Sequence, residues 1–214
     1  MNEKTKFAVG ILLFGSMWGF AECLVAPVLK NAGLPDGAIM TGVFAMLFLT
    51  ISRVLYPRRG MQIGMGLTAG ALRLFNPMGG CHVCSAIALM GEGLLFEIIW
   101  TYLTSERLGK LNSLTTKVSM GIFTSYCVFV LGYIITQILT PVLYGSFYLE
   151  NLLSMMPQYF ARGLPAGLIG GITVPVVLSL RKLDITVKDR LYYPTALGVS
   201  ALCWIAVIGA SFIV

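Results

Sequence analysis

Long uninterrupted apolar runs are the feature of this sequence that most limits what the chain can fold into. Each run is bounded by charged residues or by Pro/Gly turns. The runs cover residues 7–29, 38–56, 61–76, 82–104, 116–140, 158–180 and 192–213. A helix that crosses a bilayer needs about 20 apolar residues, so these runs predict six to seven transmembrane helices. The third run is the weakest candidate, because it is short and rich in glycine.

The composition agrees with an all-α, polytopic integral membrane bundle. Of the 214 residues, 57% are hydrophobic and 11% are charged, whereas about a quarter of the residues in soluble domains are charged. A membrane β-barrel would need segments of about 10 residues that alternate in polarity, and residues 118–138 are apolar on nearly every side instead. No polar or repeated segment divides the chain, so we expect one domain over residues 1–214.

Basic residues are distributed unevenly over the predicted connections. Lys and Arg in short loops stay on the cytoplasmic side of a membrane. One side holds 12 of the 15 basic residues, within segments 4–6, 53–59, 107–117 and 181–190, and leaves Lys30, Arg73 and Arg162 for the other. We therefore predict a cytoplasmic N-terminus and an outer C-terminus in the plasma or inner membrane. Contact with anionic lipid also explains the net charge of +6, so no nucleic-acid partner is expected.

Acidic side chains inside the apolar runs are candidates for functional sites. A carboxylate at the centre of a bilayer costs about 2.5–3.5 kcal/mol. Glu22 lies near the outer end of the first run, and Glu92 lies halfway along the fourth. Structural pairing and a ligand or proton role stay open for both. Glu97 lies nearer the cytoplasmic end, where we expect it to pair with a basic residue.

The stretch Asn76-Pro77-Met78-Gly79-Gly80-Cys81-His82-Val83-Cys84 is the most specific local pattern in the chain. Its Pro-x-Gly-Gly segment ends one helix, and the next helix then begins with free N–H groups and a positive dipole end. Cys81, His82 and Cys84 stand in that first turn, where a thiolate is stabilised. Thiolate and imidazole ligands suit zinc, copper or nickel. A transition-metal site, a disulfide and a simple helix cap all stay open here.

The layout of the first six runs resembles the substrate-binding S component of energy-coupling factor transporters. The resemblance covers about residues 6–182 and depends on the segments LYPRRG (55–60), GMGLTAG (64–70) and LPAGLIGG (164–171). It implies that a substrate is captured from outside and that small residues of the first helix contact a transmembrane coupling subunit. Gly15 and Gly19 are the candidates for that contact, where the family usually has Ala-x-x-x-Ala. A seventh run is a second departure from the family, which commonly has six helices.

Two functions from different classes remain open at this point. The first is a transport subunit, energised by partner ATPase subunits, that captures a metal ion or a small organic solute in an outer pocket. The second is a membrane thiol-disulfide oxidoreductase that uses Cys81 and Cys84. The sequence has no nucleotide-binding or hydrolase signature, so we do not expect the chain to be an enzyme if the first function holds. The residues expected to line the outer pocket are Trp18, Glu22, Cys23, Arg73, Cys81, His82, Cys84 and Glu92.

Overall fold

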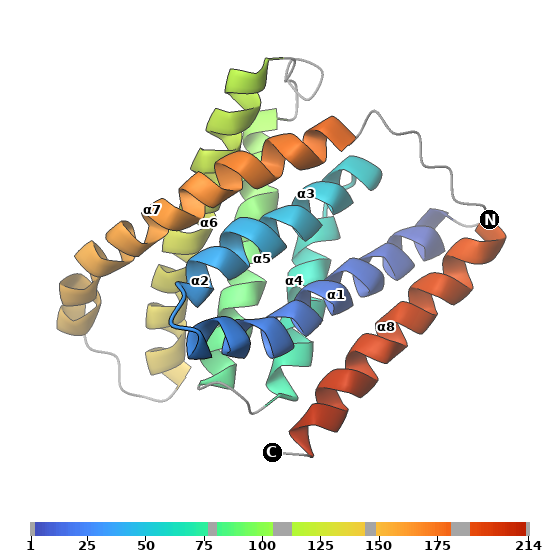
Figure 1. Ribbon diagram of the computed structural model, residues 1–214, viewed down its shortest axis with the longest axis horizontal. Coiled ribbons are helices and arrows are strands. Elements are labelled where there is room, and N and C mark those ends of the chain that lie inside the picture. Colours follow the sequence, from blue (N-terminus) through green and yellow to red (C-terminus); the bar gives the residue numbers. More distant parts are fainter. Residues whose placement is uncertain (1–2, 77–80, 105–112, 144–148, 181–188, 213–214) are drawn as a thin grey trace.

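The computed structural model describes residues 3–76, 81–104, 113–143, 149–180 and 189–212, and within them all regular structure is helical (Figure 1). The helices are α1 (Glu3–Asn31), α2 (Asp36–Ile39), the π-helix η1 (Met40–Ala45), α3 (Met46–Leu55), α4 (Met61–Leu74), α5 (His82–Thr104), α6 (Leu114–Leu143), α7 (Leu149–Leu180) and α8 (Asp189–Ser211). The predicted fold class is therefore confirmed as all-α.

Six helical segments among the described residues are long and apolar enough to cross a membrane. They are Glu3–Asn31, Asp36–Leu55, His82–Tyr102, Leu114–Leu143, Leu152–Leu180 and Leu191–Ser211. Each coincides with one of the predicted apolar runs, and the second joins α2, η1 and α3 into one continuous span. The chain thus has the helices of a multi-pass membrane protein, while the side of the membrane that each end faces stays a prediction.

The third predicted run forms α4, which is a helix of only 14 residues. At 1.5 Å per residue it is about 21 Å long, shorter than the bilayer core of about 30 Å. It packs against α1 on one side and α5 on the other, and its buried residues include Gln62, Gly66 and Arg73. A helix enclosed by other helices is not selected for a lipid-facing apolar surface, which explains its weak apolar signal.

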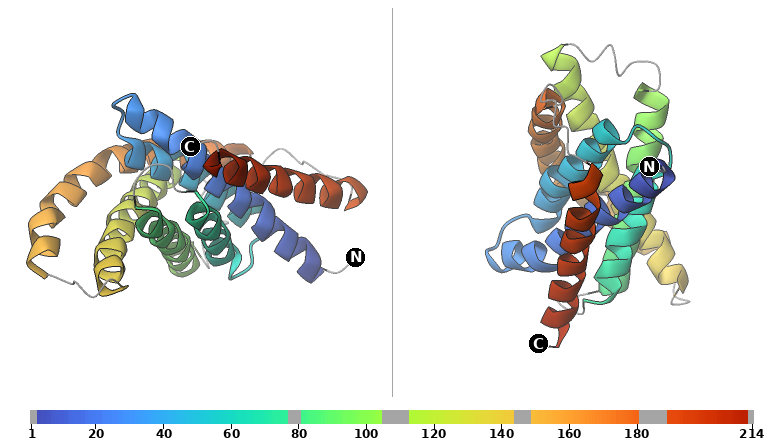
Figure 2. Two further views of the ribbon diagram at one scale, coloured as in Figure 1. Left: turned by 90° about the horizontal axis from the view of Figure 1, so that it is seen from below. Right: turned by 90° about the vertical axis from the view of Figure 1, so that its right-hand side faces the viewer.

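The helices pack in the order α8, α1, α4, α5, α6, α7, each against the next. The segment α2–η1–α3 contacts both α7 and α1 and so closes this row into a bundle. Figure 2 shows the row as an arc, with α8 at its edge beside α1. The main core lies between α1, α3, α4 and α5, with the largest buried side chains being Trp18, Phe96 and Trp100. α8 lies outside the closed bundle.

Gly15 and Gly19 lie on the face of α1 that packs against α4. A Cβ atom added at Gly15 would lie 2.6 Å from the Thr68 side chain, and one at Gly19 would lie 3.0 Å from the Ala69 backbone. Both glycines are buried. Small residues in α1 thus allow close helix packing, but the packing is inside this chain, and the structure leaves no face at Gly15 and Gly19 for the expected coupling subunit.

Candidate functional site

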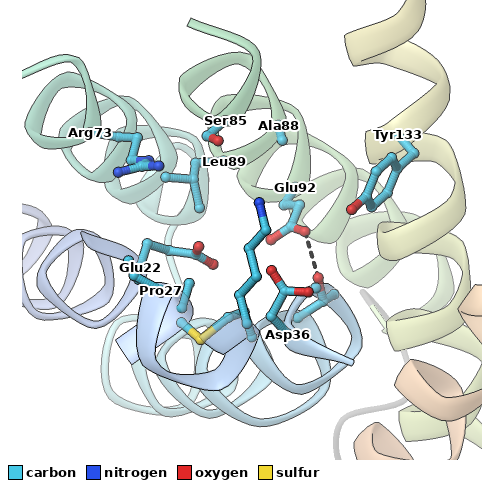
Figure 3. Close-up of a pocket in the computed structure, with 14 residues that line it drawn as sticks. Glu22, Pro27, Asp36, Arg73, Ser85, Ala88, Leu89, Glu92 and Tyr133 are labelled. Carbon is cyan, nitrogen blue, oxygen red and sulfur yellow. Dashed lines mark hydrogen bonds between the residues drawn. The ribbon is translucent and has the colours of Figure 1, made fainter. Parts of the chain in front are cut away.

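A polar cavity of about 140 Å³ opens at the end of the bundle that holds the last turns of α1 and α4 (Figure 3). Side chains from α1, α2, η1, α4, α5 and α6 line it. Its charged residues are Glu22 and Lys30 of α1, Asp36 of α2, Arg73 of α4 and Glu92 of α5. Hydroxyl groups come from Thr41 of η1, Ser85 of α5 and Tyr133 of α6. This is the end of the bundle that the charge pattern predicts to be the outer one.

One face of α5 forms a wall of the cavity, since Ser85, Ala88, Leu89 and Glu92 recur at helical spacing. Glu92 is 7% exposed. Its Oε1 atom accepts a hydrogen bond of 2.7 Å from the hydroxyl of Thr41, and this bond is the dashed line in Figure 3. Its Oε2 atom is buried and has no hydrogen-bond partner among the residues that the structure describes. Burying a carboxylate oxygen without a partner costs about 1–3 kcal/mol or more of hydration free energy. A proton or a ligand bound to Oε2 would offset this cost.

The π-helix η1 positions the hydroxyl that holds Glu92. A π turn carries an extra residue and is frequent at functional sites. Thr41 is 3% exposed and lies at the second position of η1. The next residue, Gly42, is so close to α7 that a Cβ atom there would lie 2.9 Å from the Ala166 carbonyl oxygen. This contact fixes the backbone of η1, and therefore the direction of the Thr41 side chain.

The turn between α1 and α2 brings Lys30 and Asp36 to the cavity. The N–H of Gly33 donates to the Lys30 carbonyl and the N–H of Leu34 donates to the Leu29 carbonyl, which is the pattern of a Schellman motif. Gly33 has a φ of 70°, a conformation that favours glycine. Asp36 then begins the next helix and is half-buried at the cavity.

Arg73 ties the end of α4 to the same region. It is 4% exposed, and its Nη1 atom donates to the Asn76 carbonyl at 3.5 Å. The Asn76 side chain donates in turn to the Cys23 carbonyl of α1 at 3.3 Å. Arg73 also interacts electrostatically with Glu22, and Figure 3 shows both side chains on the same side of the cavity. The cavity therefore holds charges of both signs, three acidic and two basic.

The predicted pocket residues fall into two groups. Glu22, Arg73 and Glu92 line the cavity together. Trp18 lies in the main core, and Cys23 packs with Leu72 and Val207 on the side of α1 that faces α8. Neither Trp18 nor Cys23 lines the cavity. Trp18 lies one turn before Glu22 on α1, deeper in the bundle, and Cys23 points to another face of the helix.

The Cys81–Cys84 pair lies beyond the cavity. The two residues are joined by a disulfide, Cys81 and His82 are exposed, and the Cys81 Sγ atom accepts a hydrogen bond from the Cys84 N–H. α5 begins only at His82, and Cys81 stands about 16 Å along the axis from Glu92. Among the described residues, no three His, Cys, Asp or Glu side chains come together as a metal site. The metal site at Cys81, His82 and Cys84 stays a prediction, and the disulfide is the form that the structure contains.

Asp36, Thr41 and Tyr133 also line the cavity and were not predicted from the sequence. Lys30 was predicted only to lie on the outer side. Asp36 and Lys30 stand at the ends of apolar runs, where charges are ordinary. Thr41 and Tyr133 are uncharged and common in membrane helices. Only the position of Asp36 could have been inferred from the sequence. Gly33 and Pro35 mark a turn after the first helix, so Asp36 had to lie near the end of that helix.

A second polar cluster lies at the opposite end of the bundle. The Glu97 carboxylate accepts hydrogen bonds from the N–H groups of Gly60 and Ile63 at the beginning of α4. Tyr56 lies four residues before Gly60, and its hydroxyl group is 2.6 Å from the hydroxyl group of Tyr192 in α8. Burial raises the pKa of the Tyr56 phenol above its ordinary value, and the hydrogen bond with Tyr192 is the second largest cause. These bonds join α5 to α4 and the turn before α4 to α8, and both oxygen atoms of the Glu97 carboxylate have backbone partners.

No family model, no curated protein and no solved structure matches the chain. The cavity around Glu92 is therefore the feature on which a function can be based.

Proposed function

We propose that this protein is a membrane-embedded substrate-binding subunit of a transport system, which captures a small solute in the cavity around Glu92. The observation that carries this proposal is the Oε2 atom of Glu92, which is buried and unpartnered at a cavity wall. Ionisable groups at membrane depth are expensive and mark substrate or ion pathways. Four of the five charged side chains in this cavity come from segments apolar enough to span a membrane, and the fifth, Arg73, comes from α4.

The cavity volume sets the size of the solute. A dry cavity of about 150 Å³ accommodates a benzene molecule, and the cavity here measures about 140 Å³. A solute of about six non-hydrogen atoms would fill it. Larger nutrients would need the walls to separate.

The arrangement of helices supports the proposal that such a subunit works with partners. The bundle closes around six segments (α1, α2–η1–α3, α4, α5, α6 and α7) and leaves α8 outside it. This arrangement fits the six-helix layout that the resemblance to S components implies. The chain carries no nucleotide-binding signature of its own, so partner ATPase subunits would supply the energy. Because Gly15 and Gly19 are covered by α4, a coupling subunit would have to contact a different face.

Small molecules released from the purified protein provide the test. The wild-type protein and a Glu92→Gln variant are purified from the same cells, and the solutes that each releases on denaturation are compared by mass spectrometry. We expect a solute of about six non-hydrogen atoms in the wild type that is lost from the variant, and its uptake by cells should require ATP. Identical solute profiles for the two proteins, with no ATP-dependent uptake, would rule the proposal out.

A thiol-disulfide oxidoreductase is the second candidate, because the Cys81–Cys84 disulfide lies in an exposed turn at the beginning of α5. In this reaction a partner dithiol attacks the disulfide, loses two electrons and becomes a disulfide, while Cys81 and Cys84 become thiols. A Cys84→Ser variant keeps one thiol, so its Cys81 thiolate should attack the disulfide of the oxidised partner, which is the reverse of this step. The mixed disulfide between Cys81 and the partner should then accumulate, because the serine that replaces Cys84 cannot release it. If no such species forms on non-reducing gels, the disulfide has only a structural role.

A further inference from the structure

We propose that the cavity takes a small organic monocation, whose positive end pairs with the Oε2 atom of Glu92 in exchange for a proton. This inference rests on the proposed function, since it names the substrate class of the same cavity. It depends on the sum of charges in the cavity, on the spacing of its carboxylates and on the unpartnered oxygen of Glu92.

The charges of the cavity leave room for one positive charge. With all groups ionised, Glu22, Asp36 and Glu92 contribute three negative charges, and Lys30 and Arg73 contribute two positive ones. Glu92 and Arg73 are the most buried of the five, and Lys30 is exposed at the rim. A ligand with one positive charge makes the cavity neutral, whereas an anion would add a second uncompensated negative charge in a poorly hydrated place.

The spacing of the carboxylates favours a molecule over a bare metal ion. A divalent cation is held by several oxygen ligands at about 2.0–2.6 Å. The three carboxylates do not approach one another closely enough to form such a group in the part of the chain that the structure describes. Two basic side chains in the same cavity also oppose a divalent ion. An organic cation needs only one close carboxylate, and its remaining atoms contact apolar wall residues such as Ala26, Met40 and Leu89.

A proton on Oε2 of Glu92 is the alternative way to neutralise the cavity. The Thr41 hydroxyl donates to Oε1, so this bond persists whether Oε2 is protonated or charged. Charged or titratable groups line the cavity with Glu92 from four other elements: Glu22 and Lys30 from α1, Asp36 from α2, Arg73 from α4 and Tyr133 from α6. Glu22 and Asp36 repel a negative charge on Glu92, and Lys30 and Arg73 attract it. Cation and proton therefore compete for one oxygen atom, and binding of the cation releases the proton.

The test uses three organic probes of about the same size, and one salt, on the purified full-length protein in lipid nanodiscs. The organic probes are n-butylammonium (a cation), butyrate (an anion) and alanine (a zwitterion), and sodium chloride supplies a small inorganic cation. We expect only n-butylammonium to give a saturable rise in the thermal unfolding midpoint. Its apparent affinity should fall as the pH is lowered from 8 to 6, by as much as about tenfold per pH unit, the limit for competition with one proton.

Two variants separate the role of Glu92 from general effects on the fold. Glu92→Gln keeps an oxygen that accepts from Thr41 but has no charge, so the n-butylammonium shift and its pH dependence should both disappear. Glu97→Gln removes a buried carboxylate of the same helix at the other end of the bundle, so its shift should match that of the wild type. An equal shift in wild type and Glu92→Gln would overturn the assignment of the positive end to Glu92.

The remaining outcomes distinguish this inference from the proposed function. A saturable shift with alanine or butyrate, and none with n-butylammonium, would overturn the monocation class but leave a solute site in place. A binding affinity for n-butylammonium that does not change with pH would overturn the exchange with a proton. The proposed function fails only if the wild-type protein releases no solute that Glu92→Gln lacks and transports none, which is a separate measurement.

Discussion

Glu92 and Glu97 show, at the scale of single residues, that two buried carboxylates of one helix can have different roles. Glu97 is 6% exposed and Glu92 is 7% exposed, so burial does not distinguish them. Their partners do. Glu97 accepts from two backbone N–H groups at the beginning of α4, where the helix dipole also favours a negative charge. Glu92 accepts from one hydroxyl and keeps a second oxygen at the cavity.

Glu97→Gln is expected to lower the free energy of unfolding. The amide oxygen can replace only one of the two charge-assisted hydrogen bonds, and loss of such a cap costs about 1–2 kcal/mol. Reversible unfolding in lipid bicelles provides the measurement. Glu3→Gln is the control, because the Glu3–Arg58 ion pair is exposed and such pairs contribute about 0–1 kcal/mol. Equal losses in the two variants would contradict a capping role for Glu97.

Lys30→Gln is expected to strengthen binding of n-butylammonium. Lys30 is an exposed positive charge that lines the cavity, and it repels a cationic ligand. Because solvent screens this charge, we expect its removal to raise the affinity by only about threefold. Titration of the thermal shift measures it. Lys117→Gln, at the beginning of α6, should leave the affinity unchanged. Weaker binding in Lys30→Gln would mean that Lys30 holds the ligand.

The cavity was predictable in part from single residues. Glu22, Arg73 and Glu92 are conspicuous because charge is costly in an apolar run, and all three line the cavity. The orientation of a side chain around its helix is less visible in a sequence. Cys23 follows Glu22 directly, yet it points about 100° away around α1 and faces α8 instead. The position of Cys81 outside the bundle depended on where α5 begins, which no residue pattern fixes to within a turn.

At the scale of helices, α4 and α5 approach so closely that their backbones are in contact. A Cβ atom added at Gly93 would lie 2.5 Å from the Gln62 carbonyl oxygen and 3.0 Å from the Gly66 Cα atom. Both neighbours are backbone atoms, which cannot move aside. This contact fixes the spacing of α4 and α5 beside Glu92, the residue that precedes Gly93.

Gly93→Ala is therefore expected to destabilise the protein by about 1–3 kcal/mol, the usual cost of overpacking. It should also weaken solute binding, because α4 and α5 must separate. Gly198→Ala is the matched control, since a Cβ atom there meets nothing within 4 Å, and alanine is the better helix former. The unfolding free energy of both variants checks this. A harmless Gly93→Ala would show that the two helices are less closely packed.

Helix existence was easier to predict than helix geometry. The six long apolar runs gave six helices, since an apolar segment of that length has few other stable conformations in a bilayer. The π-helix η1 was not predicted, because no residue pattern distinguishes one extra residue in a helical turn. The length of α4 was also overestimated: residues Phe75 and Asn76 belong to the predicted run but follow the last residue of the helix.

At the scale of the whole molecule, contacts distinguish the two ends of the bundle. The first turn of α1, the turn at Tyr56–Gly60 and the first turn of α8 meet at one end, through Glu3 with Arg58 and through Tyr56 with Tyr192. Asn76 and Cys23 meet at the other end, beside the cavity. α4 thus carries the chain from one end to the other although it is short. This places Lys30 and Arg59 at opposite ends.

Cysteine labelling at these two positions is expected to fix the orientation. In a variant without native cysteines, an impermeant thiol reagent applied to intact cells should modify Lys30→Cys and should miss Arg59→Cys, because short basic loops stay in the cytoplasm. Arg59→Cys should react once the membrane is permeabilised. The reverse pattern would place the cavity on the cytoplasmic side and would turn the proposed uptake into export.

The π-helix has a consequence for how this chain can change in length. Its extra residue makes η1 a place where one amino acid can be removed and the segment can still continue as an ordinary helix. Deletion of Met40 would keep Gly42 in register with α7 but would rotate α2 by about 100° relative to the cavity. Asp36 would then leave the wall, and one negative charge would be lost without any substitution. A single-codon deletion in this turn is therefore expected to keep the bundle and to change the net charge of the cavity.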